Sequence, residues 1–264
     1  MKVRAVVAMA GLVVICSLWS CSGVQNSRLA QVPAVSNQPE PEKQDQRPPD
    51  MGLRERVITE DELEALAEKD ADLNLDTCRN ILARLNTKAN RYVSDDIRKE
   101  RPLKVPCDFS AYKHWTPLPS HIPEILRTPR FILIAKDIPF LGWYEKGELK
   151  GDTYICVGKK WDMTTAGMYK VEDKHADHYS RSYPNSFGEP AWMPWSLRIY
   201  GTVYIHAGDI TKGYCSPGCI VLPLQTAEDL YQWAPVGTPV LVLDSLEDLK
   251  SALRNGAKPV ALKN

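Results

Sequence analysis

Apolar side chains recur along the chain with two different periods, and the first of them is helical. Between residues 59 and 85, apolar side chains stand three or four positions apart, as on one face of an amphipathic helix. These side chains are Leu63, Leu66, Ala67, Ile81, Leu82 and Leu85. Thr59, followed three residues later by Glu62, resembles a capping box and predicts that the first helix begins there. We expect a second helix over residues 76–85 and a short strand at residues 103–105.

From residue 130 onward, short apolar runs separated by turn signals replace the helical period. Runs of this length, rich in bulky or β-branched residues, predict strands. The expected strands cover residues 131–135, 140–144, 149–157, 169–171, 196–200, 203–206 and 240–243. A single helix is expected over residues 226–234, with Thr226 as its N-cap. The chain is therefore expected to have a mainly β C-terminal domain with one capping helix, and a small helical N-terminal subdomain.

The first 20 residues have the pattern of a secretion signal. Lys2 and Arg4 precede an apolar run that is shorter than the roughly 20 residues a membrane-spanning helix needs. The residues from Leu18 to Cys21 resemble the bacterial lipobox, in which the cysteine is acylated and becomes the first mature residue. Ser22 stands where lipoproteins retained in the inner membrane commonly have aspartate. We expect a lipid anchor on Cys21 that holds the protein in the cell envelope facing the periplasm, with the outer membrane favoured. An ordinary signal peptide cleaved elsewhere is the alternative.

Composition sets the remaining boundaries. Residues 21–57 are expected to be a flexible tether, because residues 22–50 are rich in Gln, Pro, Ser and Asn and poor in large apolar side chains. Residues 58–120 are the N-terminal subdomain, which resembles a degenerate LysM module, a type of module that binds peptidoglycan glycan chains. A purely structural subdomain is the alternative. Residues 245–264 are left as a C-terminal extension.

Charge gives no sign of a nucleic-acid partner. The 33 basic residues balance the 33 acidic ones, and no block of like charge stands out. The seven cysteines are more than a cytosolic protein of this size usually carries, which agrees with export.

Cys219 and His206 are the candidate catalytic pair. A cysteine nucleophile acts as the thiolate, and a neighbouring imidazole can take the thiol proton and return it to a leaving amine. His206 ends a predicted strand and Cys219 follows a loop, so the two lie on adjacent segments and can face each other across a cleft. Gly218 allows the backbone to approach a substrate closely and to aim amide N–H groups at a developing oxyanion.

The surroundings of this pair resemble the catalytic motif of the YkuD-type L,D-transpeptidase family. In that motif a His followed by Gly or Ala precedes a loop and then Ser-His-Gly-Cys-Ile/Val-Arg-Leu. The matching residues are His206, Ala207, Ser216, Gly218, Cys219, Ile220 and Leu222. Flanking segments extend the resemblance over residues 130–244, which sets the bounds of an expected catalytic domain with the family's β-sandwich fold.

The resemblance also implies a reaction. Cys219 attacks the carbonyl that links the third residue of a peptidoglycan stem tetrapeptide to its terminal D-alanine, with His206 as acid and base. Ser216 and Gly218 line the oxyanion side, and an amine or water releases the acyl group. No cofactor is implied. We further expect Trp195 and Tyr214 to line the substrate cleft.

Two positions depart from the motif. Pro217 replaces the usual basic residue, and Val221 replaces an arginine that helps to order the active-site loop. Three outcomes therefore stay open: transpeptidation, hydrolysis of the stem peptide by the same fold, and a cell-wall-binding lipoprotein without chemistry.

The remaining cysteines and histidines have plainer interpretations. Cys78 and Cys107 are either disulfide-bonded or two buried thiols, and Cys156 is expected to be a core residue. Cys215 could join His206 and Cys219 at a metal site or form a reversible disulfide with Cys219, but its spacing fits no common zinc pattern and we expect no metal. The histidines expected to be solvated are His114, His121, His175 and His178.

Overall fold

The computed structural model describes residues 52–184 and 187–254. The predicted signal peptide, Cys21 and most of the predicted tether lie outside these residues. In the part of the chain that is described, no helix is both long enough and apolar enough to cross a membrane.

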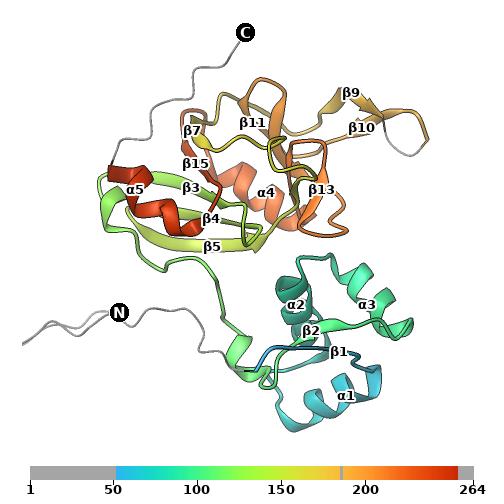
Figure 1. Ribbon diagram of the computed structural model, residues 1–264. Coiled ribbons are helices and arrows are strands. Elements are labelled where there is room, and N and C mark those ends of the chain that lie inside the picture. The colour runs from blue at the N-terminus through green and yellow to red at the C-terminus, as the bar shows by residue number, and fades with distance from the viewer. Residues whose placement is uncertain (1–51, 185–186, 255–264) are drawn as a thin grey trace, which may run out of the picture. The chain divides into compact units, whose positions relative to one another are not determined.

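In the N-terminal subdomain, three helices follow one another in the sequence between two short strands, which pair with each other (Figure 1). Its elements are β1 (Arg54–Arg56), α1 (Glu60–Lys69), α2 (Leu75–Asn86), α3 (Asn90–Arg98) and β2 (Leu103–Val105). Strands β1 and β2 pair antiparallel. Both predicted helices and the predicted strand are confirmed, and Thr59 caps α1 by accepting a hydrogen bond from the Glu62 N–H at 3.2 Å. The LysM interpretation stays a prediction.

Two elements of this subdomain were not predicted. Helix α3 is mostly polar and buries only Val93, Asp96 and Ile97, so its sequence carries little helical period. Strand β1 lies within the segment predicted to be a tether, and its pairing with β2 moves the start of ordered structure ahead of residue 57.

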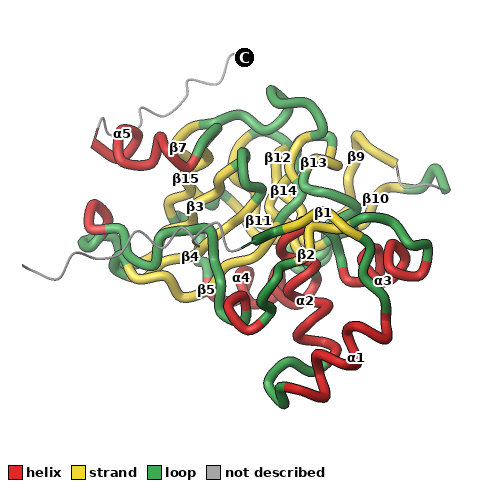
Figure 2. Tube along the Cα trace, turned by 60° about the horizontal axis from the view of Figure 1, so that its bottom comes forward, coloured by secondary structure: helices red, strands yellow, loops and turns green. Residues whose placement is uncertain are grey.

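The C-terminal domain is built on two sheets that pack face to face (Figure 2). The five-stranded sheet has the order β5 (Glu148–Tyr154), β4 (Phe140–Glu145), β3 (Arg130–Ala135), β15 (Pro239–Leu243), β7 (Gly167–Lys170). The four-stranded sheet has the order β14 (Ile220–Leu222), β12 (Val203–Ala207), β11 (Ser196–Tyr200), β8 (Asp173–His175). The two-stranded pairs are β6 (Val157–Gly158) with β13 (Tyr214–Ser216) and β9 (Tyr179–Pro184) with β10 (Pro190–Trp192). The helices are α4 (Leu224–Trp233) and α5 (Leu249–Arg254), with 3-10 turns η2 (Pro123–Ile125) and η3 (Leu246–Asp248). The 3-10 turn η1 (Ser110–Tyr112) belongs to the N-terminal subdomain, because Tyr112 packs in its core.

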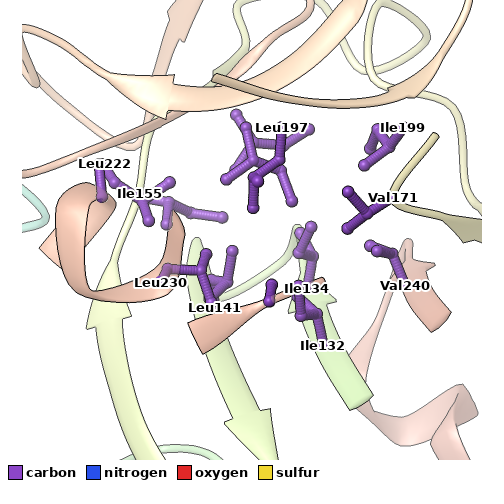
Figure 3. Close-up of a cluster of buried hydrophobic side chains, with 14 of the residues drawn as sticks. Ile132, Ile134, Leu141, Ile155, Val171, Leu197, Ile199, Leu222, Leu230 and Val240 are labelled. Atoms are coloured by element: carbon purple, nitrogen blue, oxygen red, sulfur yellow. The ribbon is translucent and has the colours of Figure 1, made fainter. Parts of the chain in front are cut away.

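The main core fills the space between these two sheets and α4. Figure 3 shows Ile132, Ile134 and Leu141 of the five-stranded sheet facing Leu197 and Ile199 of the four-stranded sheet. The opposite face of the five-stranded sheet is buried as well, under α5 and the segment before β3. Burial on both faces explains why β3 reads as a continuous apolar run rather than an alternating one. The predicted mainly β fold is confirmed.

Two boundaries differ from prediction. Helix α4 begins at Leu224 with Pro223 as its N-cap residue, so Thr226 lies inside the helix and does not cap it. The expected strand over residues 149–157 is divided into β5 and β6, with Cys156 in the break. Residues 246–254, part of the predicted C-terminal extension, form η3 and α5 and pack on the core through Leu249.

Candidate active site

The register of β12 and β14 brings Cys219 and His206 to the same face of the four-stranded sheet. The two strands are parallel, with Ile205 paired to Ile220, so that Cys219 stands opposite Tyr204. Because side chains alternate along a strand, the core residues Ile205 and Ile220 leave Tyr204, His206 and Cys219 on the opposite face. His206 is therefore the diagonal neighbour of Cys219, a separation that side chains of this size can bridge.

The His206 imidazole is held in one tautomer. Its Nδ1 lies 2.7 Å from the carbonyl oxygen of Ala207, which can only accept, so the neutral ring carries its proton on Nδ1 and leaves Nε2 as a base. Burial is the main reason that the pKa of His206 is lowered to about 4; the Ala207 carbonyl opposes this shift, and the charge of His178 adds to it. The imidazole is therefore neutral at physiological pH.

The Cys219 thiol is also neutral in the resting site. Burial raises its pKa, and a hydrogen bond from the Tyr204 backbone N–H to the sulfur works in the opposite direction. The sulfur lies 3.9 Å from the carbonyl oxygen of Thr202. A neutral thiol and a neutral imidazole on one face of the sheet are the groups needed for attack by sulfur with the imidazole as general base.

The loop that carries the candidate nucleophile, residues 216–220, is fixed by hydrogen bonds within the protein. Ser216 Oγ accepts from the Gly218 N–H at 3.0 Å and donates to the Cys219 carbonyl at 2.6 Å. Thr164 Oγ1 donates to the Gly218 carbonyl at 2.7 Å. Gly218 has φ +138, and a Cβ there would lie 2.8 Å from the carbonyl oxygen of Met163. Glycine is required here because an L side chain meets both strain and a clash.

These contacts change the role expected for Ser216 and Gly218. The Gly218 N–H is already donated to Ser216, so in this conformation neither group is directed at an oxyanion. Both residues shape the loop around Cys219 instead. Their proposed place on the oxyanion side stays a prediction.

Cys215 forms a disulfide with Cys156, which corrects the interpretation of both residues. Cys156 is a core residue, as expected, but it is not a free thiol. A bonded Cys215 is neither a metal ligand nor a partner for Cys219. The pairing joins residues 59 positions apart, a proximity that the apolar context of Cys156 does not reveal.

The alternative of a disulfide between Cys78 and Cys107 is wrong, because both are free thiols. Cys78 lies on the buried face of α2, with its Sγ 3.3 Å from the Leu73 carbonyl oxygen. Cys107 is exposed, with its Sγ 2.8 Å from the Gly52 carbonyl oxygen. The two cysteines thus belong to different environments, and the expectation of two buried thiols holds only for Cys78.

Trp195 and Tyr214 make structural contacts. Trp195 packs against the main core, with its ring centroid 5.3 Å from that of Tyr231. Tyr214 also packs on this core, and its hydroxyl donates to the Lys136 carbonyl oxygen at 2.8 Å. Their contact with substrate stays a prediction.

His178 and Tyr204 are neighbours of the site that the sequence analysis missed. The His178 ring lies 4.7 Å from that of Tyr204 and 5.3 Å from that of His175. His175 is exposed, as expected, but His178 is half-buried between the two rings. Tyr204 was detectable, because it stands two residues before His206 in a predicted strand and so shares its face.

The family model described as the L,D-transpeptidase catalytic domain, YkuD, matches residues 129–242. A search of curated proteins finds no match.

Among solved structures, an L,D-transpeptidase from Mycobacterium smegmatis is 22% identical over 44% of this chain and 58% of its own, with a TM-score of 0.39. An L,D-transpeptidase from Enterococcus faecium is 26% identical over 44% of this chain and 50% of its own, with a TM-score of 0.38. An L,D-transpeptidase from Xylanimonas cellulosilytica is 16% identical over 74% of this chain and 100% of its own, with a TM-score of 0.48. The chain thus spans little more than half the length of the first two.

Proposed function

We propose that the protein is a cysteine-dependent L,D-transpeptidase acting on peptidoglycan stem peptides, because residues 129–242 match the family model of the YkuD L,D-transpeptidase catalytic domain. The observation that carries this proposal is the placement of Cys219 and His206 on one face of adjacent parallel strands. The fixed tautomer of His206, with Nε2 free to act as a base, supports it.

The proposed reaction has two acyl transfers. The Cys219 sulfur attacks the carbonyl carbon between the third stem residue and the terminal D-alanine, while its proton passes to Nε2 of His206. The tetrahedral adduct collapses, the C–N bond breaks, and His206 protonates the departing D-alanine amine. An acceptor amine then attacks the thioester, gives its proton to His206, and leaves Cys219 as the thiol.

Hydrolysis is the second candidate outcome. Val221 cannot supply the charge-assisted hydrogen bonds of an arginine, which are worth about 1.5–3 kcal/mol each, and Pro217 has no N–H to donate. A less ordered loop would admit water to the thioester. We favour transfer because Val221 is buried against Cys156 and Ile210, which keeps the base of the loop apolar.

The test is incubation of the purified chain with a stem tetrapeptide, with and without an excess of acceptor amine, followed by mass spectrometry. Dimer or exchanged product, absent for Cys219→Ala and retained for the control Cys107→Ala, supports transfer. Tripeptide alone in the presence of the acceptor shows a hydrolase. If no product forms and a carbapenem gives no acyl adduct on Cys219, the protein is not an enzyme of this class. It would then be a cell-wall-binding protein without chemistry.

We also propose that a lipid anchor on Cys21 holds the protein in the cell envelope, facing the periplasm and favouring the outer membrane. Acyl chains on one residue suffice for stable attachment when two or more are present. Cys21→Ala should move the protein from the membrane to the soluble fraction, whereas the matched control Cys16→Ala, within the predicted signal segment, should not. Continued membrane retention of Cys21→Ala would disprove the anchor.

A further inference from the structure

Cys156 holds both ends of the nucleophile loop. On the C-terminal side, its backbone exchanges two hydrogen bonds with Val221, at 2.9 Å from the Cys156 N–H and 2.8 Å to the Cys156 carbonyl. On the N-terminal side, its side chain is bonded to Cys215. The five residues between these attachments, 216–220, include Cys219. One buried residue thus closes the loop at its base.

Neighbouring contacts fix the N-terminal side of the loop relative to β6. The Val157 N–H donates to the Gly213 carbonyl at 2.9 Å, and the Lys159 N–H donates to the Ser216 carbonyl at 2.8 Å. The disulfide lies within a small apolar cluster with Ile210 and Val221. The covalent bond between Cys156 and Cys215 is therefore the strongest connection between Cys156 and the segment before Cys219.

We propose that the Cys156–Cys215 disulfide is a positioning element that holds the Cys219 sulfur against the Tyr204 N–H and beside His206. Without the bond, Cys215 is joined to β6 only by hydrogen bonds, and the loop can move outward from the sheet. The sulfur then leaves its buried position, which makes it easier for a small reagent to reach and worse placed for attack on a carbonyl. The effect on acyl transfer rests on the proposed function, whereas the effect on the reactivity of Cys219 does not.

The bond can be removed in two ways. Dithiothreitol donates two electrons and two protons, the S–S bond becomes two thiols, and the reagent closes to its cyclic disulfide. Cys215 is partly exposed, so this reduction can be carried out on the folded protein. The double variant Cys156→Ala, Cys215→Ala removes the bond permanently, and Cys78→Ala, Cys107→Ala removes the same number of cysteines elsewhere as a control.

The experiment compares stem-peptide turnover with the rate at which iodoacetamide alkylates Cys219, located by peptide mass mapping. Loss of the bond should lower kcat by about 10- to 100-fold, since displacements near 1 Å have such effects, with a smaller change in KM. Alkylation of Cys219 at neutral pH should rise roughly threefold, because a thiol released from burial ionises more readily. Reoxidation with oxidised glutathione should restore both values, and the control variant should change neither.

Simple unfolding would also lower turnover and raise alkylation, so the two rates support positioning only where near-UV circular dichroism shows that the protein keeps its native fold. If the double variant does not fold, the reduced wild-type protein, monitored by near-UV circular dichroism, decides the question. Unchanged alkylation after mass spectrometry confirms reduction would overturn the inference, as would Cys156 and Cys215 found as free thiols in fully active protein. If the oxidised protein turns over no stem peptide, the proposed function fails, while the alkylation rates still test the positioning role.

Discussion

Burial shifts the pKa values of the two candidate catalytic groups in opposite directions. It lowers the pKa of His206 and raises the pKa of Cys219, and in both cases the neutral form is favoured. The site therefore rests as a thiol and an imidazole rather than as an ion pair. In the proposed reaction, the sulfur becomes a strong nucleophile only as its proton passes to His206.

The first prediction concerns the pH dependence of the thiol. Alkylation of Cys219 by iodoacetamide should keep rising above about pH 10, where a free thiol with a pKa near 8.5 is already almost fully ionised, since the pKa of Cys219 is raised by burial. Turnover should persist into the acid range and fall only near the pKa of His206, about 4. A plateau in alkylation near pH 7 would instead indicate a thiolate–imidazolium pair.

The second prediction concerns stability. The pKa of His206 falls from 6.5 to about 4 on folding, so its contribution is fully present above pH 6.5 and is lost as the pH falls toward 4. The shift corresponds to a loss on the order of 3 kcal/mol in the free energy of unfolding. Urea titrations at several pH values should show this loss in the wild-type protein and not in His206→Gln. Parallel curves for the two proteins would contradict it.

At the residue scale, sequence patterns singled out a candidate nucleophile and a candidate base but not their surroundings. Cys219 and His206 lie in a short motif, and local spacing is enough to single them out. The disulfide and the position of His178 depend on segments far apart in the chain. Gly218 was expected to aim amides at an oxyanion, but its N–H is taken by Ser216, a contact set by the fold of the loop.

At the scale of elements, strand register determines whether Cys219 and His206 lie on the same face of the sheet. The parallel pairing of β12 and β14 places Tyr204 opposite Cys219, and a shift by one residue would move His206 to the core face. Strongly periodic helices and apolar strands were predictable, because their burial leaves a pattern. Helix α3 was not, since tertiary contacts rather than its own period stabilise it.

Lys136 illustrates how elements far apart are joined beside this site. Its side chain is buried, and Nζ donates at 2.7 Å both to the Trp161 carbonyl and to Asp244, which follows β15. The ammonium also lies 4.5 Å from the centre of the Trp161 ring. We predict that Lys136→Met lowers the free energy of unfolding by about 1–3 kcal/mol, because the stem is kept and the charged hydrogen bonds are lost.

The matched control is Lys170→Met, on the exposed end of β7. Urea unfolding of both variants at one pH measures the difference. An equal and small effect for the two would show that the buried position of Lys136 adds nothing.

At the scale of the whole molecule, composition and period predicted a mainly β domain and a helical subdomain, and both are present. What they could not predict is which cysteines meet. Disulfide formation needs two Cα atoms within a few ångströms, and sequence separation does not determine that distance. The observed bond lies in the C-terminal domain, whereas the pairing considered from the sequence lies in the N-terminal subdomain.

The last prediction is the order in which the cysteines of the described chain react. In native protein, iodoacetamide should label exposed Cys107 first and partly buried Cys219 more slowly. Cys78, with no exposed surface, should react only after urea unfolding, because its sulfur is enclosed by the subdomain core. Cys156 and Cys215 should require reduction as well. Digestion without reductant, followed by mass spectrometry, reads the order and the linkage together. A peptide joining Cys78 to Cys107, or native labelling of Cys78 as fast as that of Cys107, would contradict the structure of the subdomain.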